Sequence, residues 1–249
     1  MSADSELTKH RRVVILAGGK GTRLRPYTTV LPKPLMPIGD RPILDIILRQ
    51  LKYYGFEHVT IACGYLAELV EAFFGDGSNW DLAIDYHRES EPLGTAGALS
   101  TIDGLDDSFL VMNGDVLTDI DYRKLFEAHC SSDACATIAA HRREVGVAFG
   151  IMRFDDEDGS PRLTGYEEKP TLSYEVSMGV YCFSPAIREF VEPNVYLDFP
   201  DLILKLVAHG EIVRGWRSDA YWLDIGRHDD YETANDEFEA IRDRLLPHE

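Results

Sequence analysis

Long apolar runs are missing from this sequence of 249 residues. No run approaches the about 20 residues that a membrane-spanning helix needs, so we expect no membrane span and no membrane partner. The first 12 residues, MSADSELTKHRR, are polar and lack the apolar centre of a secretory signal. These two absences predict a cytoplasmic protein.

Cysteine is also scarce, with four residues in the whole chain. They show no C-x-x-C spacing and no neighbouring histidine pattern, so the spacing indicates neither a zinc site nor a redox motif. We expect reduced and mostly packed thiols, as in cytoplasmic proteins. The four are Cys63, Cys130, Cys135 and Cys182.

Positive charge is the third scarcity. The chain has 25 Lys and Arg against 43 Asp and Glu, which gives a formal net charge of −18. A protein with this charge is repelled by the nucleic-acid backbone, so nucleic acid is not an expected partner. A site for a phosphorylated small molecule would need locally concentrated positive groups and a metal ion.

The order of apolar segments predicts the fold class and the domain organisation. Hydrophobic residues make up 45% of the chain, which suits one large globular domain; we place it at 12–240, with tails at 1–11 and 241–249. Strand and helix patterns alternate over the first 140 residues, which predicts a doubly wound, Rossmann-like α/β sheet. One of these helices follows Asp121, a predicted N-cap. Closely spaced strands after residue 147 predict an antiparallel insertion, and therefore a mixed sheet.

The segment 13–35, VVILAGGKGTRLRPYTTVLPKPL, departs from the acidic character of the chain. Three glycines follow a buried strand, and four basic residues accompany them without any acidic residue. Glycine lets backbone N–H groups approach an anion closely, so this layout predicts a phosphate site. It is neither a P-loop, which needs Gly-Lys-Ser/Thr, nor a dinucleotide fingerprint, because Leu24 stands at the third glycine position. The basic residues are Lys20, Arg23, Arg25 and Lys33.

The stretch LAGGKGTRLRPYTTVLPKPL resembles the signature of the sugar-1-phosphate nucleotidylyltransferases, also called nucleotide-sugar pyrophosphorylases. The resemblance continues through EPLGTAGAL, NGD, EEKP, GVYCF and WLDIG, and covers roughly residues 12–240. The pattern is most similar to mannose-1-phosphate and heptose-1-phosphate guanylyltransferases. Because the chain ends at Glu249, we expect it to correspond to the catalytic domain alone. Relatives of this kind often form dimers or tetramers, so the resemblance also implies a homo-oligomer.

The resemblance implies one reaction. A nucleoside triphosphate and a sugar 1-phosphate give a nucleotide sugar and pyrophosphate, by in-line attack of the sugar-phosphate oxygen on the α-phosphorus. The nucleophile is already an anion, so catalysis must align two repelling anions and neutralise developing charge. That requirement implies cations, backbone donors and Mg²⁺. Both substrates are therefore expected partners, and Mg²⁺ is the expected cofactor.

The family pattern also implies the roles of individual residues. The catalytic residues implied are Arg23, Lys33 and Asp115, and the metal ligands are Asp115 and Asp224. The nucleotide-binding residues implied are Leu16, Ala17, Gly18, Gly19, Gly21, Thr22, Arg23, Pro92, Gly94, Thr95, Asn113 and Gly114. The sugar-phosphate residues implied are Gly150, Glu168, Lys169, Ser177 and Gly179. The family often has Asn where Ser177 stands, so we expect that contact with the sugar to be shifted or lost.

Several alternatives remain open at this point. The stretch EPLGTAGAL lacks the Gln common in thymidylyl and uridylyl branches, which favours GTP. A thymidylyl-, uridylyl-, adenylyl- or cytidylyltransferase acting on glucose 1-phosphate or another sugar is the alternative. An inactive nucleotide-sugar-binding regulatory protein is the alternative of a different class, although all four expected polar site residues are present. A nicotinamide-dependent dehydrogenase fails on the missing third glycine.

Overall fold

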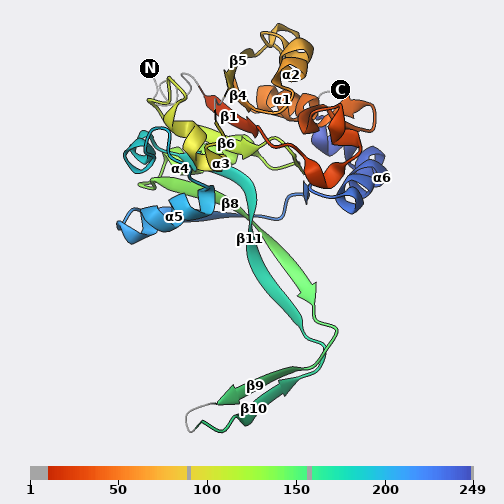
Figure 1. Ribbon diagram of the computed structural model, residues 1–249, viewed down its shortest axis with the longest axis vertical. Coiled ribbons are helices and arrows are strands. Elements are labelled where there is room, and N and C mark those ends of the chain that lie inside the picture. Colours follow the sequence, from red (N-terminus) through yellow and green to blue (C-terminus); the bar gives the residue numbers. More distant parts are fainter. Residues whose placement is uncertain (1–10, 89–90, 156–158, 248–249) are drawn as a thin grey trace.

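The computed structural model describes residues 11–88, 91–155 and 159–247. Its centre is a seven-stranded sheet in the order β12-β8-β11-β6-β1-β4-β5. Helices lie on both faces of this sheet, and a long two-stranded arm projects from it (Figure 1). The predicted Rossmann-like mixed α/β sheet with inserted antiparallel strands is confirmed.

The first half of the chain supplies the parallel part of the sheet. Strand β1 pairs in parallel with β4 and β6, and β4 pairs in parallel with β5. The strands are β1 (Arg12–Ala17), β4 (His58–Cys63), β5 (Ala83–Arg88) and β6 (Phe109–Asn113). The helices between and after them are α1 (Ile43–Tyr53), α2 (Ala67–Phe74), α3 (Gly94–Gly97) and α4 (Tyr122–Cys130). Of these, α3 is a single short turn, continued by a 3-10 turn at Ala98–Ser100.

The second half supplies the antiparallel part. Strand β11 lies between β6 and β8 and is antiparallel to both, while β12 joins β8 in parallel. The strands of this half are β8 (Ala136–Gly146), β9 (Ile151–Asp155), β10 (Arg162–Glu167), β11 (Thr171–Phe183), β12 (Val213–Ser218) and β13 (Trp222–Asp224). Its helices are α5 (Phe199–Ala208) and α6 (His228–Leu245). Among the described residues, three two-stranded pairs lie outside the main sheet: β9 with β10, β2 (Pro37–Ile38) with β3 (Arg41–Pro42), and β7 (Val116–Thr118) with β13.

Successive residues of the central strands alternate between two hydrophobic cores. In β1, Val13 and Ile15 belong to the core beneath α1, α2 and α6, whereas Val14 belongs to the core beneath α3 and α5. Both faces of these strands are buried, which explains why their sequences are continuously apolar. The result is a rigid platform whose parallel strands end together at one edge.

Two features qualify the expected boundaries. Residues 1–10 of the predicted N-terminal tail lie outside the described residues, while Arg11 is buried and donates to Glu127. The predicted boundary at 240 falls inside α6, because Ile241 and Leu245 continue the apolar face of that helix into the core. The C-terminal segment is therefore helical and packed as far as Leu245.

The cysteine prediction agrees with the structure. All four cysteines are free, and Cys63, Cys135 and Cys182 are buried. None of the described helices combines the length and the apolarity needed to cross a bilayer.

The N-cap of α4 offers a test of the fold. The Asp121 carboxylate accepts a hydrogen bond from the Lys124 backbone N–H at 2.9 Å, as predicted. We expect Asp121→Ala to lower the free energy of unfolding by about 1 kcal/mol, because one helix-end N–H loses its partner. Urea unfolding followed by circular dichroism measures this change. Asp103→Ala, which removes an exposed carboxylate outside any helix, is the control; equal losses in both variants would contradict the capping role.

Candidate active site

Two adjoining hollows lie where the parallel strands end, and they share Leu16, Gly19 and Asp115. The first hollow is lined by Leu16, Ala17, Gly19, Gly21, Thr22, Arg23, Lys33, Pro34, Gly114, Asp115 and Gly226. The second is lined by Leu16, Gly18, Gly19, Ala62, Pro92, Gly94, Thr95, Asn113, Asp115, Tyr196 and Asp198. The structure therefore brings together every residue predicted to bind nucleotide, from three separate parts of the chain.

The glycine loop after β1 forms one wall of the first hollow. Gly21 has a φ of 57°, and a Cβ there would lie 2.8 Å from a methyl carbon of Thr28. The Thr28 hydroxyl donates to the Gly21 carbonyl at 2.7 Å, which fixes this turn. A Cβ on Gly19 would meet nothing within 4 Å, so the loop faces open space at that position. A ligand can approach this backbone closely.

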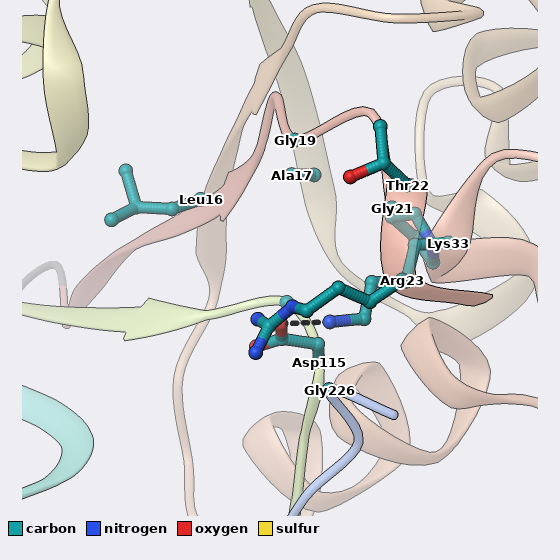
Figure 2. A pocket seen from close by; sticks show the side chains of 11 residues that line it. Leu16, Ala17, Gly19, Gly21, Thr22, Arg23, Lys33, Asp115 and Gly226 are labelled. Atoms are coloured by element: carbon teal, nitrogen blue, oxygen red, sulfur yellow. Dashed lines mark hydrogen bonds and ion pairs between the residues drawn. The ribbon is translucent and has the colours of Figure 1, made fainter. Parts of the chain in front are cut away.

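Lys33 is held by its neighbours in a 3-10 turn, Lys33–Leu35. Pro32 precedes this turn, and Pro34 and Leu35 within it are buried. The Lys33 side chain is only 12% exposed, and its ammonium is ion-paired with Oδ2 of Asp115. Figure 2 shows Arg23 reaching toward the same carboxylate from the glycine loop. Two cations from the segment 13–35 thus line the hollow that contains Asp115.

A pair of short strands brings the second acid to the first. Asp115 lies between β6 and β7, and β13 pairs antiparallel with β7 so that Asp224 stands opposite Val116. The Ile225 N–H donates to the Asp115 carbonyl at 3.0 Å, which locks the two segments together. This pairing explains how two aspartates far apart in sequence share one site.

The electrostatics of the two acids differ. Asp224 is exposed, yet the surrounding protein desolvates its carboxylate and raises its pKa. The Asp115 charge raises this pKa further, while Lys33 and Arg23 oppose the shift. The Oδ1 atom of Asp115 is buried and has no hydrogen-bond partner among the described residues. The site therefore combines an unpartnered oxygen of Asp115 with the Asp224 carboxylate, whose charged form is disfavoured.

These features fit a divalent cation. Carboxylate oxygens are the ligands that Mg²⁺ prefers, and it usually takes one or two of them together with water and phosphate oxygens. An unpartnered buried oxygen and a neighbouring acid of raised pKa are the two donors such an ion would use. Among the described residues no cluster of three or more His, Cys, Asp or Glu side chains could hold a metal, so the protein offers a pair of acids rather than a closed cage.

The predicted sugar-phosphate residues are divided by the structure. Ser177 and Gly179 lie on the part of β11 inside the main sheet, where a Cβ on Gly179 would meet the Asn113 side chain at 2.7 Å. The Ser177 hydroxyl donates to the Tyr181 hydroxyl and accepts from the Gly179 N–H, so it is already engaged locally. Gly150, Glu168 and Lys169 lie instead on the arm and are not brought to either hollow within this chain.

Sequence reasoning missed several lining residues. Gly226 packs against the Arg23 guanidinium in the first hollow, and it belongs to the WLDIG motif, which could have indicated it. Tyr196 and Asp198 line the second hollow, where Asp198 accepts hydrogen bonds from Thr95. No motif marks these two residues, because their place depends on how the loop before α5 packs against α3. Lys20 and Arg25 are exposed and lie outside the lining of both hollows.

Comparison with known proteins decides the family. The family model described as nucleotidyl transferase matches residues 12–241. This chain belongs to that family. Its match extends from the first strand through most of α6, and includes both hollows and the arm.

Individual members of the nucleotidyl transferase family are similar along most of the chain. A UTP–glucose-1-phosphate uridylyltransferase of Synechocystis is 33% identical over 90% of this chain, which spans 62% of that relative's length. A D-glycero-α-D-manno-heptose 1-phosphate guanylyltransferase of Aneurinibacillus thermoaerophilus is 34% identical, with 91% of this chain and 97% of the relative covered. The solved structure of HddC from Yersinia pseudotuberculosis complexed with GMP-PN has a TM-score of 0.69 and 28% identity, covering 92% of this chain and 99% of that one.

The raised pKa of Asp224 leads to a prediction about stability. In the ligand-free protein the charged carboxylate is less favourable folded than unfolded, so it reduces stability once the pH exceeds its unfolded pKa of about 3.9. We expect Asp224→Asn to raise the melting temperature at pH 7, and the gain to fade as the pH falls below the unfolded pKa. Thermal unfolding in metal-free buffer measures this dependence.

The matched control is Asp219→Asn, which removes an exposed carboxylate after β12. It should change the melting temperature little at any pH. A lower melting temperature for Asp224→Asn than for the wild type at pH 7 would contradict the electrostatic reading of the site.

Proposed function

We propose that the chain transfers a nucleoside monophosphate from a nucleoside triphosphate to a sugar 1-phosphate, with release of pyrophosphate, and that GTP is the preferred nucleotide. The proposed catalytic domain is 12–240. The observation that carries the proposal is one hollow, beside an open glycine loop, that is lined by Arg23 and by the ion pair of Lys33 with Asp115. These two cations supply positive charge in a protein of net charge −18, and a triphosphate site requires such charge.

The assignment of substrates rests on the relatives. They are named for transfer of uridylyl and guanylyl groups to glucose 1-phosphate and a heptose 1-phosphate, and the HddC structure is complexed with GMP-PN. The guanylyl relative matches over nearly its whole length, and the sequence around Gly94 lacks the Gln common in thymidylyl and uridylyl branches. Both observations support GTP over UTP.

The geometry supports a division of the nucleotide between the two hollows. The triphosphate lies in the first hollow, where backbone N–H groups of the glycine loop and the Arg23 guanidinium meet its charge. The nucleoside lies in the second hollow, between Gly94, Thr95 and the end of β6. Asp115 lines both hollows, so we expect the α-phosphate to lie beside it.

The reaction is a displacement at the α-phosphorus. A sugar-phosphate oxygen forms a new P–O bond, the bond to the β-phosphate oxygen breaks, and pyrophosphate leaves with the bonding electrons. Arg23 stabilises the charge that grows on the departing pyrophosphate, and Lys33 neutralises the reacting phosphates. Asp115 and Asp224 would hold Mg²⁺, which supplies Lewis-acid neutralisation of phosphate charge when bound. No general base is required, because the attacking oxygen is already an anion.

A substrate matrix tests the proposed function. ATP, GTP, UTP, CTP and dTTP are each combined with mannose 1-phosphate, glucose 1-phosphate and D-glycero-α-D-manno-heptose 1-phosphate, and pyrophosphate release is measured. We expect product with at least one pair and the highest kcat/KM with GTP. A higher kcat/KM with UTP, dTTP, ATP or CTP would contradict the base assignment alone. No product with any pair would overturn the transferase function in favour of an inactive nucleotide-sugar-binding regulatory protein.

The role of Arg23 gives a second prediction. Arg23→Ala should lower kcat by about 100- to 1,000-fold, because the leaving group loses a positioned cation in the transition state. Steady-state kinetics with the best pair from the matrix measure the loss. Arg25→Ala removes the same charge from an exposed position of the same loop, and should leave kcat within about twofold. Equal losses of kcat in the two variants would contradict a specific role for Arg23, because they would show that the rate depends on the total positive charge of the loop.

A further inference from the structure

The arm, residues 141–176, carries an uncovered apolar face at its far end. It consists of the outer parts of β8 and β11 with the β9–β10 pair beyond them (Figure 1). In that pair Met152 stands opposite Tyr166 and Phe154 opposite Leu163, so the four side chains share one face. They are 54%, 61%, 50% and 52% exposed, respectively. A two-stranded sheet is marginally stable by itself, and an apolar patch of this kind marks a surface that packs against protein.

The arm also separates two halves of the proposed sugar-phosphate site. Ser177 and Gly179 remain beside Asn113 at the body, whereas Gly150, Glu168 and Lys169 lie beyond the outer end of the β8–β11 ribbon. The ribbon between the pairs Ser177–Ala140 and Thr171–Gly146 has six residue steps on each strand, or about 20 Å. It points away from the body (Figure 1), so Lys169 of this chain does not reach its own Asp115.

Within this ribbon there is no place at which the arm could fold back onto its own body. The pairing of β8 with β11 is regular over all seven pairs from Gly146–Thr171 to Ala140–Ser177. The register shift in β11, between Ser177 and Tyr181, lies at the body, where Gly179 adopts a φ of 73°. The direction of the arm is therefore set where it leaves the main sheet, and the ribbon beyond that point has no break at which to turn back.

We propose that the arm of a second copy of this chain completes the sugar-phosphate half of each site, in a dimer that exchanges arms; this inference rests on the proposed function. A second copy accounts for both the exposed apolar face and the divided site. Its hollows lack Glu168 and Lys169 of its own chain, and its arm has an apolar face that packing against the first copy would bury. A two-fold axis makes the exchange reciprocal, so both sites are completed and both apolar faces are buried. The expected homo-oligomer then becomes a requirement of the chemistry.

Active-site complementation tests the exchange. Asp115→Asn has a defective body and an intact arm, whereas Lys169→Ala has an intact body and a defective arm. Each variant alone should be nearly inactive, since every site then contains one defect. After denaturation together in equal amounts and refolding, half of the dimers are mixed, and each mixed dimer has one site built from two intact parts. We expect about a quarter of the wild-type rate of pyrophosphate release.

The matched control is a mixture of Asp115→Asn chains with Asp224→Asn chains, refolded together in the same way. Both substitutions lie in the body of the chain, so an exchange of arms cannot produce an intact site. Recovery with the first mixture but not with the control supports the proposal. No recovery in either mixture, with wild type active and refolded to full rate, means that each arm serves its own chain and overturns it.

Sedimentation provides a reading that does not depend on activity. Wild type should sediment as a dimer or larger assembly, and Phe154→Glu with Leu163→Glu should shift it to a monomer by placing charge on the apolar face. A wild-type monomer, or an assembly unchanged by these two substitutions, contradicts the arm exchange. Inactivity of the wild type with every substrate pair would overturn the proposed function only, and the sedimentation result would still decide the exchange.

Discussion

The site depends on one constraint: two aspartates are held side by side in a protein that already carries excess negative charge. The pairing of β7 with β13 enforces this proximity, and the backbone bond from Ile225 to Asp115 secures it. The charged form of the Asp224 carboxylate is therefore unfavourable in the folded protein, as its raised pKa indicates. Lys33 neutralises one oxygen of Asp115 and leaves the other without a partner. The arrangement is stabilised by adding positive charge and is therefore suited to a metal–triphosphate complex.

The remaining architecture serves to hold this arrangement in place. The strands that end at the site are buried on both faces between two cores, so their ends are rigid. The glycine loop and the proline-flanked turn of Lys33 lie beside that edge and line one hollow. A pre-organised set of cations and N–H groups accelerates phosphoryl transfer without reorganising during the reaction. The arm carries Gly150, Glu168 and Lys169 on a separate element, and in the proposed arm exchange the meeting of the two substrates depends on assembly.

Local patterns in the sequence predicted much of this structure. The strand before the glycines, the Asp121 cap and the alternating helices and strands follow from neighbours within a few residues, and the structure agrees with them. The resemblance also indicated the residues that line the two hollows. Two features escaped prediction because they arise from the arrangement of segments that are distant in the sequence. Tyr196 and Asp198 reach the second hollow by loop packing, and the arm separates Lys169 from Asp115.

The central claim is that Asp115 and Asp224 form one cation site that the nucleotide completes. Electron paramagnetic resonance of Mn²⁺, titrated with protein and a non-hydrolysable GTP analogue, measures it most directly. The account predicts that Mn²⁺ binds to the wild type with the analogue present and that Asp115→Asn and Asp224→Asn each weaken this binding by about tenfold or more. Mn²⁺ affinity that is unchanged in both variants would contradict it.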